Sequence, residues 1–370
     1  MSARFLTVVL ERAFNMRDGF GREIDYMRIS VIDSCNLNCY YCNPCDNNEH
    51  CHALNILSVK EVLCIVRAAT RLGIKHFRLT GGEPLLHPQL DEMVLQIKKI
   101  PGVSSVSLTT NAVLLAQHAK WLKEAGIDSI NVSLDTIDAS EYERITKKPL
   151  LEEVKHGINA AIECGIRVKI NVVLTPQTDV VALTRYVAKK GTDIRFIEMM
   201  PVGEGHTNGV EPYKKVIGTL SKLYGEPCRI NTEKTKEINS GNDKRKIPDN
   251  GPAEYYIFPE LGIRVGLIQA IHGKFCDTCN RIRVTADGRL MPCLGSSVTM
   301  DLVPDSWDFA DDVEKDFAIV RALRATIKAK PRCHNFNDNA VTYTKTTETK
   351  TTEIEAAEVN AARNMSRIGG

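Results

Sequence analysis

Residues 26–42 read YMRISVIDSCNLNCYYC and join the first apolar, β-branched run of the chain to three closely spaced cysteines. The run predicts a buried strand, and the cysteines follow at its C-terminal end with the spacing C-x3-C-x2-C. Parallel α/β folds build their sites at this end of the strands. The stretch therefore predicts an α/β protein with a cysteine-lined site beside its first strand.

Five more strand-like runs follow within the first two hundred residues, and segments with helical periodicity separate them. Such alternation predicts βαβ units and a parallel sheet. No Gly-x-Gly-x-x-Gly follows the first strand, so a dinucleotide-binding doubly wound sheet is disfavoured and we expect a partial (β/α)6 barrel of the TIM type. The five runs are KHFRLTG (75–81), SVSLTTN (105–111), SINVSLD (129–135), RVKINVVL (167–174) and DIRFIEMM (193–200).

Helix-capping and turn residues mark where helices begin and end along the chain. Ser58 and Glu61 form a capping-box pattern at the start of a helix that closes on Gly73, and a second amphipathic helix ends on Gly165. The Asp287-Gly288 pair is a hairpin signal. Helices are also expected at 212–225 and 312–328, and a polar loop at 231–251.

The chain divides into three predicted parts. Residues 1–205 form the barrel with its cysteine loop, and residues 206–335 form an α+β extension that closes the barrel. Residues 336–370 form a polar tail without a core of its own, ending in Gly369 and Gly370.

Composition narrows the class of protein. The 370 residues are 43% hydrophobic and 25% charged with a net charge of only +2, which is typical of a globular protein and disfavours nucleic-acid or membrane partners. No apolar run is long enough for a membrane span or a secretory signal, so a cytoplasmic location is expected. Twelve cysteines in a reducing compartment point to metal or redox chemistry.

The first cysteine triad leaves a tetrahedral site one ligand short. For a four-iron cluster, three cysteines leave one iron free to hold a small molecule. The alternatives are ordinary buried cysteines, or a zinc loop completed by Cys45, Cys51 or His52. The triad is Cys35, Cys39 and Cys42.

A second triad has the spacing C-x2-C-x13-C within FCDTCNRIRVTADGRLMPCL (275–294). A zinc ribbon completed by His272 is one interpretation. Arg281 and Arg283 instead place two guanidinium groups on one strand face next to the cysteines, and such a face suits a polyphosphate. The triad is Cys276, Cys279 and Cys293.

The cysteine loop followed by GGEP (81–84) after the second strand resembles the radical S-adenosylmethionine superfamily. The resemblance narrows to the GTP 3′,8-cyclases that begin molybdenum-cofactor biosynthesis, and it covers almost the whole chain. The segments that carry it are GREIDYMRIS, FRLTGGEPLL, SLTTN, INVSLDTIDASEYERIT, VKINVVL, RFIEMMP, the second triad with its Asn-Arg-Ile-Arg run, and the terminal Gly-Gly.

The resemblance implies a role for each matching residue. The two triads would each hold a [4Fe–4S] cluster, and the C-terminal glycines Gly369 and Gly370 would insert into the barrel and help catalysis. The binding site for S-adenosylmethionine would be lined by Tyr41, Gly82, Glu83, Ser133 and Met200. GTP would be bound by Arg28, Arg78, Thr109, Lys169, Arg195, Arg281, Ile282 and Arg283.

The resemblance also implies the reaction and the partners. A 5′-deoxyadenosyl radical would abstract the ribose 3′-hydrogen of GTP, and the ribose carbon would then attack guanine C8 to give (8S)-3′,8-cyclo-7,8-dihydroguanosine 5′-triphosphate, which makes the enzyme a lyase. Expected partners are an electron donor such as flavodoxin or ferredoxin and the downstream cyclic pyranopterin monophosphate synthase, and the family is compatible with a homodimer.

Three positions depart from the family pattern: Asn43 after the third cysteine, and His76 and His87 near the expected phosphate region. The departures keep open a two-cluster radical S-adenosylmethionine enzyme that acts on another nucleotide or a peptide. A zinc-binding interaction protein is the non-enzyme alternative. The sequence leaves open the roles of Cys45, Cys51, Cys64, Cys164, Cys228 and Cys333.

Overall fold

The computed structural model describes most of the chain. Outside the described residues lie the polar loop at 231–250, Asn43, Cys45, Cys51, His52 and the terminal Gly369 and Gly370. The described residues are 16–42, 55–202, 209–230, 251–296, 298–302, 312–334, 336, 344–347 and 350–353.

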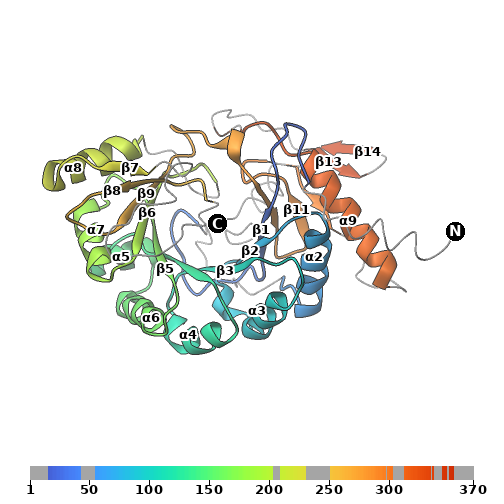
Figure 1. Ribbon diagram of the computed structural model, residues 1–370, viewed down its shortest axis with the longest axis horizontal. Coiled ribbons are helices and arrows are strands. Elements are labelled where there is room, and N and C mark those ends of the chain that lie inside the picture. The colour runs from blue at the N-terminus through green and yellow to red at the C-terminus, as the bar shows by residue number, and fades with distance from the viewer. Residues whose placement is uncertain are drawn as a thin grey trace.

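Six parallel strands form the centre of one twelve-stranded sheet and follow each other in sequence order. Figure 1 shows the sheet curving into an open barrel. The partial (β/α)6 barrel is therefore confirmed. Its strands are β1 (Tyr26–Ser30), β2 (His76–Thr80), β3 (Ser105–Thr110), β4 (Ser129–Ser133), β5 (Val168–Val173) and β6 (Asp193–Ile197).

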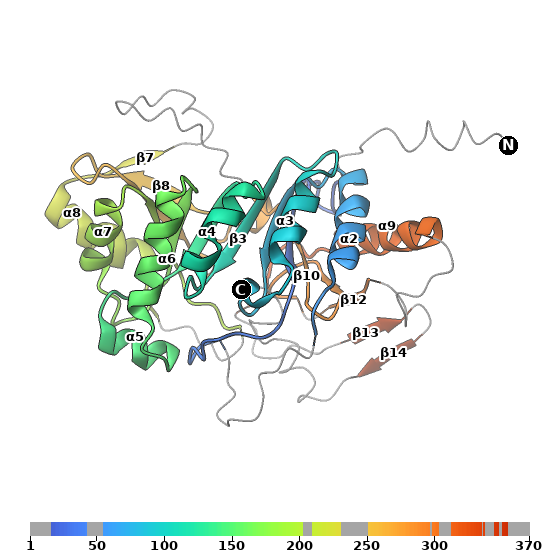
Figure 2. The ribbon, with the colours of Figure 1, turned by 90° about the horizontal axis from the view of Figure 1, so that it is seen from below.

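Helices cover the outer face of this barrel (Figures 1 and 2). The predicted capping box is present, since the Ser58 side chain accepts a hydrogen bond from the Glu61 amide while the Glu61 carboxylate accepts one from the Ser58 amide. The helices are α2 (Val59–Arg71), α3 (Leu90–Lys98), α4 (Leu115–Glu124), α5 (Ala139–Thr146), α6 (Leu151–Glu163) and α7 (Val180–Lys189).

The two faces of the barrel strands differ in chemistry. Met27 and Ile29 of β1 are fully buried and belong to the hydrophobic core, as do Phe77 and Leu79 of β2. Alternate residues point to the opposite side of a strand. We call this opposite side, which faces away from α2–α7, the inner face.

The C-terminal extension continues the same sheet at both edges. Strand β9 (Arg264–Ile268) pairs in parallel with β6, and β10 (Arg281–Val284) pairs in parallel with β1. The barrel therefore gains one parallel strand on each side from sequence that lies beyond residue 250. The antiparallel strands are β7 (Cys228–Ile230), β8 (Glu254–Ile257), β11 (Arg289–Met291) and β12 (Met300–Asp301).

The predicted hairpin and helices of this extension are also present. Gly288 adopts φ +77° at the turn between β10 and β11, a conformation that favours glycine. Helix α9 (Asp312–Lys328) lies beside α2 (Figure 2), and Arg71 pairs with Asp316 at 2.8 Å. The shorter elements are η1 (Pro84–Leu86), η2 (Tyr213–Ile217), α8 (Gly218–Tyr224), η3 (Cys276–Thr278) and, in the tail, the hairpin β13 (Thr344–Thr347) with β14 (Lys350–Glu353).

Candidate active site

The first cysteine loop docks against the turn that follows β2. The Gly82 amide donates to the Ile32 carbonyl and the Glu83 amide to the Ser34 carbonyl, both at 2.8 Å. A Cβ atom on Gly81 would lie 2.3 Å from the Ile32 oxygen, and one on Gly82 would lie 2.1 Å from the Ser34 oxygen. Both glycines are therefore needed because the two backbones approach too closely for any side chain.

Glu83 ties the ends of two strands together beneath this turn. Its fully buried carboxylate accepts hydrogen bonds from the Thr110 hydroxyl at 2.7 Å, the Asn111 amide at 2.7 Å and the Leu85 amide at 3.0 Å. Burial raises the pKa of Glu83 to about 7, although these hydrogen bonds favour the charged form. In the described structure the carboxylate thus holds β3 against the GGEP turn.

A second, half-buried carboxylate anchors the other end of the cysteine loop. The Tyr41 hydroxyl donates to one oxygen of Asp135 at 2.5 Å, and the Val173 amide donates to the other at 2.8 Å. The Asn111 side chain reaches the Cys35 sulfur at 3.8 Å. Asp135 and Asn111 were not singled out from the sequence, although each is the last residue of a predicted strand, where barrel enzymes place functional groups.

The thiols of the first triad sit in acidic, buried surroundings. Burial and the nearby Glu83 raise the pKa of Cys35 to about 12, and burial and Asp135 raise that of Cys42 to about 12. Burial raises the pKa of Cys39 as well, and the neighbouring thiols of Cys42 and Cys35 add to this shift. Neutral thiols release their protons when they bind a metal cluster, so the donor set fits a cationic iron centre.

Ser133 lies at the end of a strand, as the sequence predicted, whereas Met200 lies in the loop beyond β6, which ends at Ile197. Ser133 is the last residue of β4, and its register partner is Asn171 of β5. Met200 follows β6 and packs against the buried pair Val202 and Met291. Both sit at the end of the barrel that carries the first triad.

Arginines line the inner face across three neighbouring strands. Arg28 of β1 pairs in register with Arg78 of β2 on one side and with Arg283 of β10 on the other. Tyr26, two residues earlier, pairs with Arg281, whose guanidinium lies 5.4 Å from the centre of the tyrosine ring. We call these four arginines the arginine row.

The arginine row is a strongly cationic surface. Burial, Arg283 and Arg78 together lower the pKa of Arg28 well below its usual value. Burial likewise lowers the pKa of Arg283 to about 10, with Arg281 acting in the same direction. Buried like charges are costly unless an anion compensates them, so this surface is suited to a polyanionic ligand.

The opposite wall of the barrel adds two more cations. Lys169 is buried on β5 and its ammonium lies 3.5 Å from the Tyr255 hydroxyl. Arg195 on β6 is 5% exposed, and its Nε and one terminal nitrogen have no hydrogen-bond partner among the described residues. Burial lowers the pKa of Arg281, and the charge of Arg195 acts in the same direction, so cations of the two walls repel each other.

Two remaining GTP candidates differ in position. The Thr109 hydroxyl lies on the inner face and accepts a hydrogen bond from Arg78 at 3.4 Å. Ile282 is fully buried in the hydrophobic core, on the opposite face of β10 from Arg281 and Arg283. A contact between Ile282 and a ligand on the inner face would therefore have to come from its backbone.

The second triad forms at the other end of the inner face. Cys276 begins η3 and Cys279 directly follows it, just before β10. Cys293 follows β11, which runs antiparallel to β10. Burial raises the pKa of the Cys276 thiol, and the thiols of Cys293 and Cys279 contribute to the shift. Burial also acts to raise the pKa of Cys279, but Lys330 and Arg281 lie beside it and lower it overall. The structure thus brings the three cysteines together in cationic surroundings.

The donors of the zinc alternative lie only partly among the described residues, because Cys45, Cys51 and His52 are outside them. Across the described ranges, no three His, Cys, Asp or Glu side chains form a group that could hold a single metal ion. A four-iron cluster binds each cysteine through a different iron, so its thiolates need not converge on one point. His272, the proposed fourth zinc ligand, contacts Glu198 through Nδ1.

Comparisons with known proteins match both halves of the chain. The model of the "Radical SAM superfamily" matches residues 29–182, and that of "Molybdenum Cofactor Synthesis C" matches residues 192–336. The GTP 3′,8-cyclase of Clostridium perfringens strain SM101 is 35% identical over 324 residues, 87% of this chain and 95% of that protein. The chain belongs to the GTP 3′,8-cyclase family. The enzyme of Pelotomaculum thermopropionicum is 38% identical over 294 residues, 78% of this chain and 86% of that protein.

Solved structures agree on the fold. Streptococcus suis SuiB superimposes with a TM-score of 0.54 at 15% identity, covering 81% of this chain and 65% of SuiB. The family resemblance, the barrel fold and the enzyme class expected from the sequence are thus confirmed. As a member of the radical S-adenosylmethionine superfamily, the chain uses a [4Fe–4S] cluster and S-adenosylmethionine as cofactors. Among the described residues, no helix is long and apolar enough to cross a membrane.

The two histidines that depart from the family pattern have different surroundings. His87 is buried, with Nε2 2.9 Å from the Leu57 carbonyl and Nδ1 accepting from the Gln89 amide at 3.1 Å. Both ring nitrogens are therefore used within the fold. His76 lies on the inner face, stacked on Tyr26 and bonded to the Ser105 hydroxyl at 2.8 Å.

The remaining described cysteines are scattered. Cys64 is buried in the hydrophobic core, Cys164 is half-buried behind α6, and Cys228 and Cys333 are exposed. The first two are consistent with ordinary packing residues.

Proposed function

We propose that this chain converts GTP to (8S)-3′,8-cyclo-7,8-dihydroguanosine 5′-triphosphate in the first step of molybdenum-cofactor biosynthesis. The observation that carries the proposal is the arginine row on the inner face, with a cysteine triad at each end. The first triad follows the C-terminal end of β1, and the second lies beside the N-terminal end of β10, its parallel neighbour. The five residues of β1 span about 15 Å.

This arrangement suits a long, polyanionic substrate. The four arginines, with Arg195 and Lys169 opposite, supply charge-assisted hydrogen bonds for a triphosphate. The base would lie toward the second triad and the ribose toward the first. Holding the substrate at both ends fixes the ribose relative to the guanine ring, which is what ring closure within one molecule requires.

We assign the cofactors to the two ends of the inner face. Cys35, Cys39 and Cys42 would hold the first [4Fe–4S] cluster, and the second triad would hold another. When bound, the first cluster and S-adenosylmethionine supply the electron and the radical that remove the ribose 3′-hydrogen. Tyr41, Gly82, Glu83, Ser133 and Met200 surround the first cluster's end of the barrel.

The residues of this chain would act by positioning and shielding. The Tyr41–Asp135 hydrogen bond and the contacts of Gly82 with the cysteine loop hold the first triad in place. The inner face, whose arginine and lysine side chains are half-buried or buried, would limit water and competing hydrogen donors around the ribose. We propose flavodoxin or ferredoxin as the electron donor and a cyclic pyranopterin monophosphate synthase as the consumer of the product.

Anaerobic turnover tests this function. The reduced protein, loaded with iron and sulfide, is incubated with S-adenosylmethionine and either GTP, ATP or guanosine, and the products are analysed by mass spectrometry. We expect a cyclised product of unchanged mass from GTP, and 5′-deoxyadenosine in matching amount. Cyclised product from ATP at the same rate, or none from GTP, would contradict the proposal.

A further inference from the structure

Lys330 lies two residues beyond the end of α9 and is only 2% exposed. Its ammonium donates to the Arg281 carbonyl at 2.7 Å and to the Pro292 carbonyl at 2.8 Å, and it also hydrogen-bonds the Cys279 thiol. A lysine ammonium has three N–H donors. All three are therefore directed to the segments that carry the second triad.

The positive charge of Lys330 needs an anion to compensate it. Within the described part of the chain, no carboxylate pairs with this buried ammonium. A buried charge is costly unless hydrogen bonds and an opposite charge compensate it. A thiolate at Cys279 is the anion within reach, and a cysteine that binds iron is a thiolate.

The two carbonyls that Lys330 binds lie next to different cysteines. Arg281 is two residues after Cys279, and Pro292 immediately precedes Cys293. The lysine thus connects the start of β10, just after Cys279, to the residue that follows β11, just before Cys293. Neither segment contacts the other through a β-ladder at these positions, since the β10–β11 pairing begins at Arg283 and Met291.

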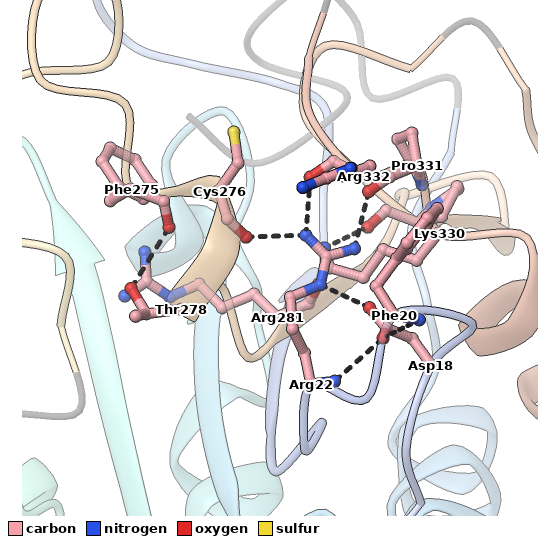
Figure 3. A network of polar contacts seen from close by, with 11 residues as sticks. Asp18, Phe20, Arg22, Phe275, Cys276, Thr278, Arg281, Lys330, Pro331 and Arg332 are labelled. Carbon is pink, nitrogen blue, oxygen red and sulfur yellow. Dashed lines mark hydrogen bonds and ion pairs between the residues drawn. The ribbon is translucent and has the colours of Figure 1, made fainter.

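Arg22 completes the connection on the side of Cys276. Its guanidinium donates to the Cys276 carbonyl at 2.6 Å and to the carbonyls of Pro331 and Arg332 at 2.6 and 3.0 Å. Figure 3 shows this guanidinium lying between Cys276 and the segment that carries Lys330. The buried Asp18 carboxylate holds the Arg22 Nε at 2.5 Å. The backbone around Lys330 is therefore fixed to the same triad.

We propose that Lys330 is a positioning residue of the second cysteine triad, which holds its three segments together and places a fixed positive charge beside the cluster bound there. The inference rests on the proposed function, because it takes Cys276, Cys279 and Cys293 as cluster ligands. A positive charge stabilises the more electron-rich state of a neighbouring cluster. Lys330 thus raises the reduction potential of the second cluster relative to the same cluster without it.

The test uses three substitutions of one residue and a matched control. Lys330→Met removes both the charge and the donors, Lys330→Gln keeps amide donors without the charge, and Lys330→Arg keeps the charge. Lys328→Met is the control, because Lys328 is an exposed lysine two residues away. Iron and sulfide content are measured anaerobically in the full chain. The potential is measured by redox titration with electron paramagnetic resonance, in a background in which the first triad is replaced by serine.

We expect the iron content to fall from about eight per chain in the wild type to about four in Lys330→Met, while reductive cleavage of S-adenosylmethionine continues. Lys330→Gln should shift the potential of the second cluster to more negative values, and Lys330→Arg should restore it toward that of the wild type. Lys328→Met should change neither quantity. If Lys330→Met does not fold, the Gln and Arg variants decide the question.

Two results separate the possible failures. A Lys330→Gln variant with wild-type iron content and potential would overturn the role of Lys330 while leaving the proposed function intact. A wild-type chain that takes up only about four irons under conditions that load the first triad would instead overturn the second cluster, and with it the proposed function.

Discussion

Replacing Gly82 with alanine tests how the first cysteine loop is held. A methyl group at this position would lie 2.1 Å from the Ser34 oxygen and 2.7 Å from the Asp33 oxygen, and both atoms belong to the backbone and cannot rotate away. The loop must therefore move from the turn. The backbone hydrogen bonds from Gly82 to Ile32 and from Glu83 to Ser34 would then break.

The size of the effect follows from these two bonds. A buried backbone group left without its partner costs about 1–3 kcal/mol, so losing both predicts a destabilisation of about 2–6 kcal/mol. That is a large part of the roughly 5–15 kcal/mol by which a domain is stable. Because the displaced loop carries the first triad, Gly82→Ala should also lose most of its iron at that site.

The assay is anaerobic denaturant unfolding together with iron content and S-adenosylmethionine cleavage. Gly218→Ala serves as the control, since Gly218 has a helical φ of −61° and no atom within 4 Å of a Cβ. The control should be unchanged or more stable by about 0.5–1 kcal/mol, because alanine favours helix. If Gly82→Ala matched the control in stability and iron content, the close backbone approach could not be what holds the loop.

Three further predictions address separate parts of the site. Cys35→Ser should abolish reductive cleavage of S-adenosylmethionine, whereas Cys279→Ser should chiefly impair GTP binding; equal loss of GTP binding in both folded variants would argue against separate roles. Arg281→Ala and Arg195→Ala should each weaken GTP binding by roughly tenfold to a hundredfold, since a charge-assisted hydrogen bond contributes about 1.5–3 kcal/mol. Binding of guanosine, which has no phosphates, should change little. Normal GTP affinity in both variants would place the triphosphate elsewhere. Burial lowers the pKa of His87 below 6.5, so the folded protein is favoured above about pH 6.5, where the ring is neutral, and loses this contribution on acidification. The free energy of unfolding should therefore fall less steeply between about pH 8 and 5.5 in His87→Asn than in the wild type. An unchanged slope would refute this.

The sequence predicted local features best. The six barrel strands, the capping box at Ser58 and the helix at 312–328 depend on periodicity and nearby residues, and all are present. The parallel pairing of β9 with β6 and of β10 with β1 was not specified, because short apolar runs do not indicate which distant strand they will join.

For the candidate site too, the sequence predicted local patterns but not contacts between distant segments. The cysteine spacings and the glycine pair could be read directly, since they are local patterns. The structural role of Glu83, the anchoring of Tyr41 by Asp135, and the position of Lys330 depend on contacts between segments up to some three hundred residues apart, for which a single lysine or carboxylate gives no signal. Ile282 illustrates the reverse case, where a family match does not reveal which face of the strand the side chain occupies.

The most direct test of the account is anaerobic turnover of GTP that carries deuterium only at the ribose 3′ position. If the chain holds GTP on the arginine row with its ribose toward the first triad, deuterium should appear in 5′-deoxyadenosine, and the cyclised nucleotide should lack it. 5′-Deoxyadenosine without deuterium, formed while GTP is consumed, would contradict the account, because the hydrogen would then come from another position.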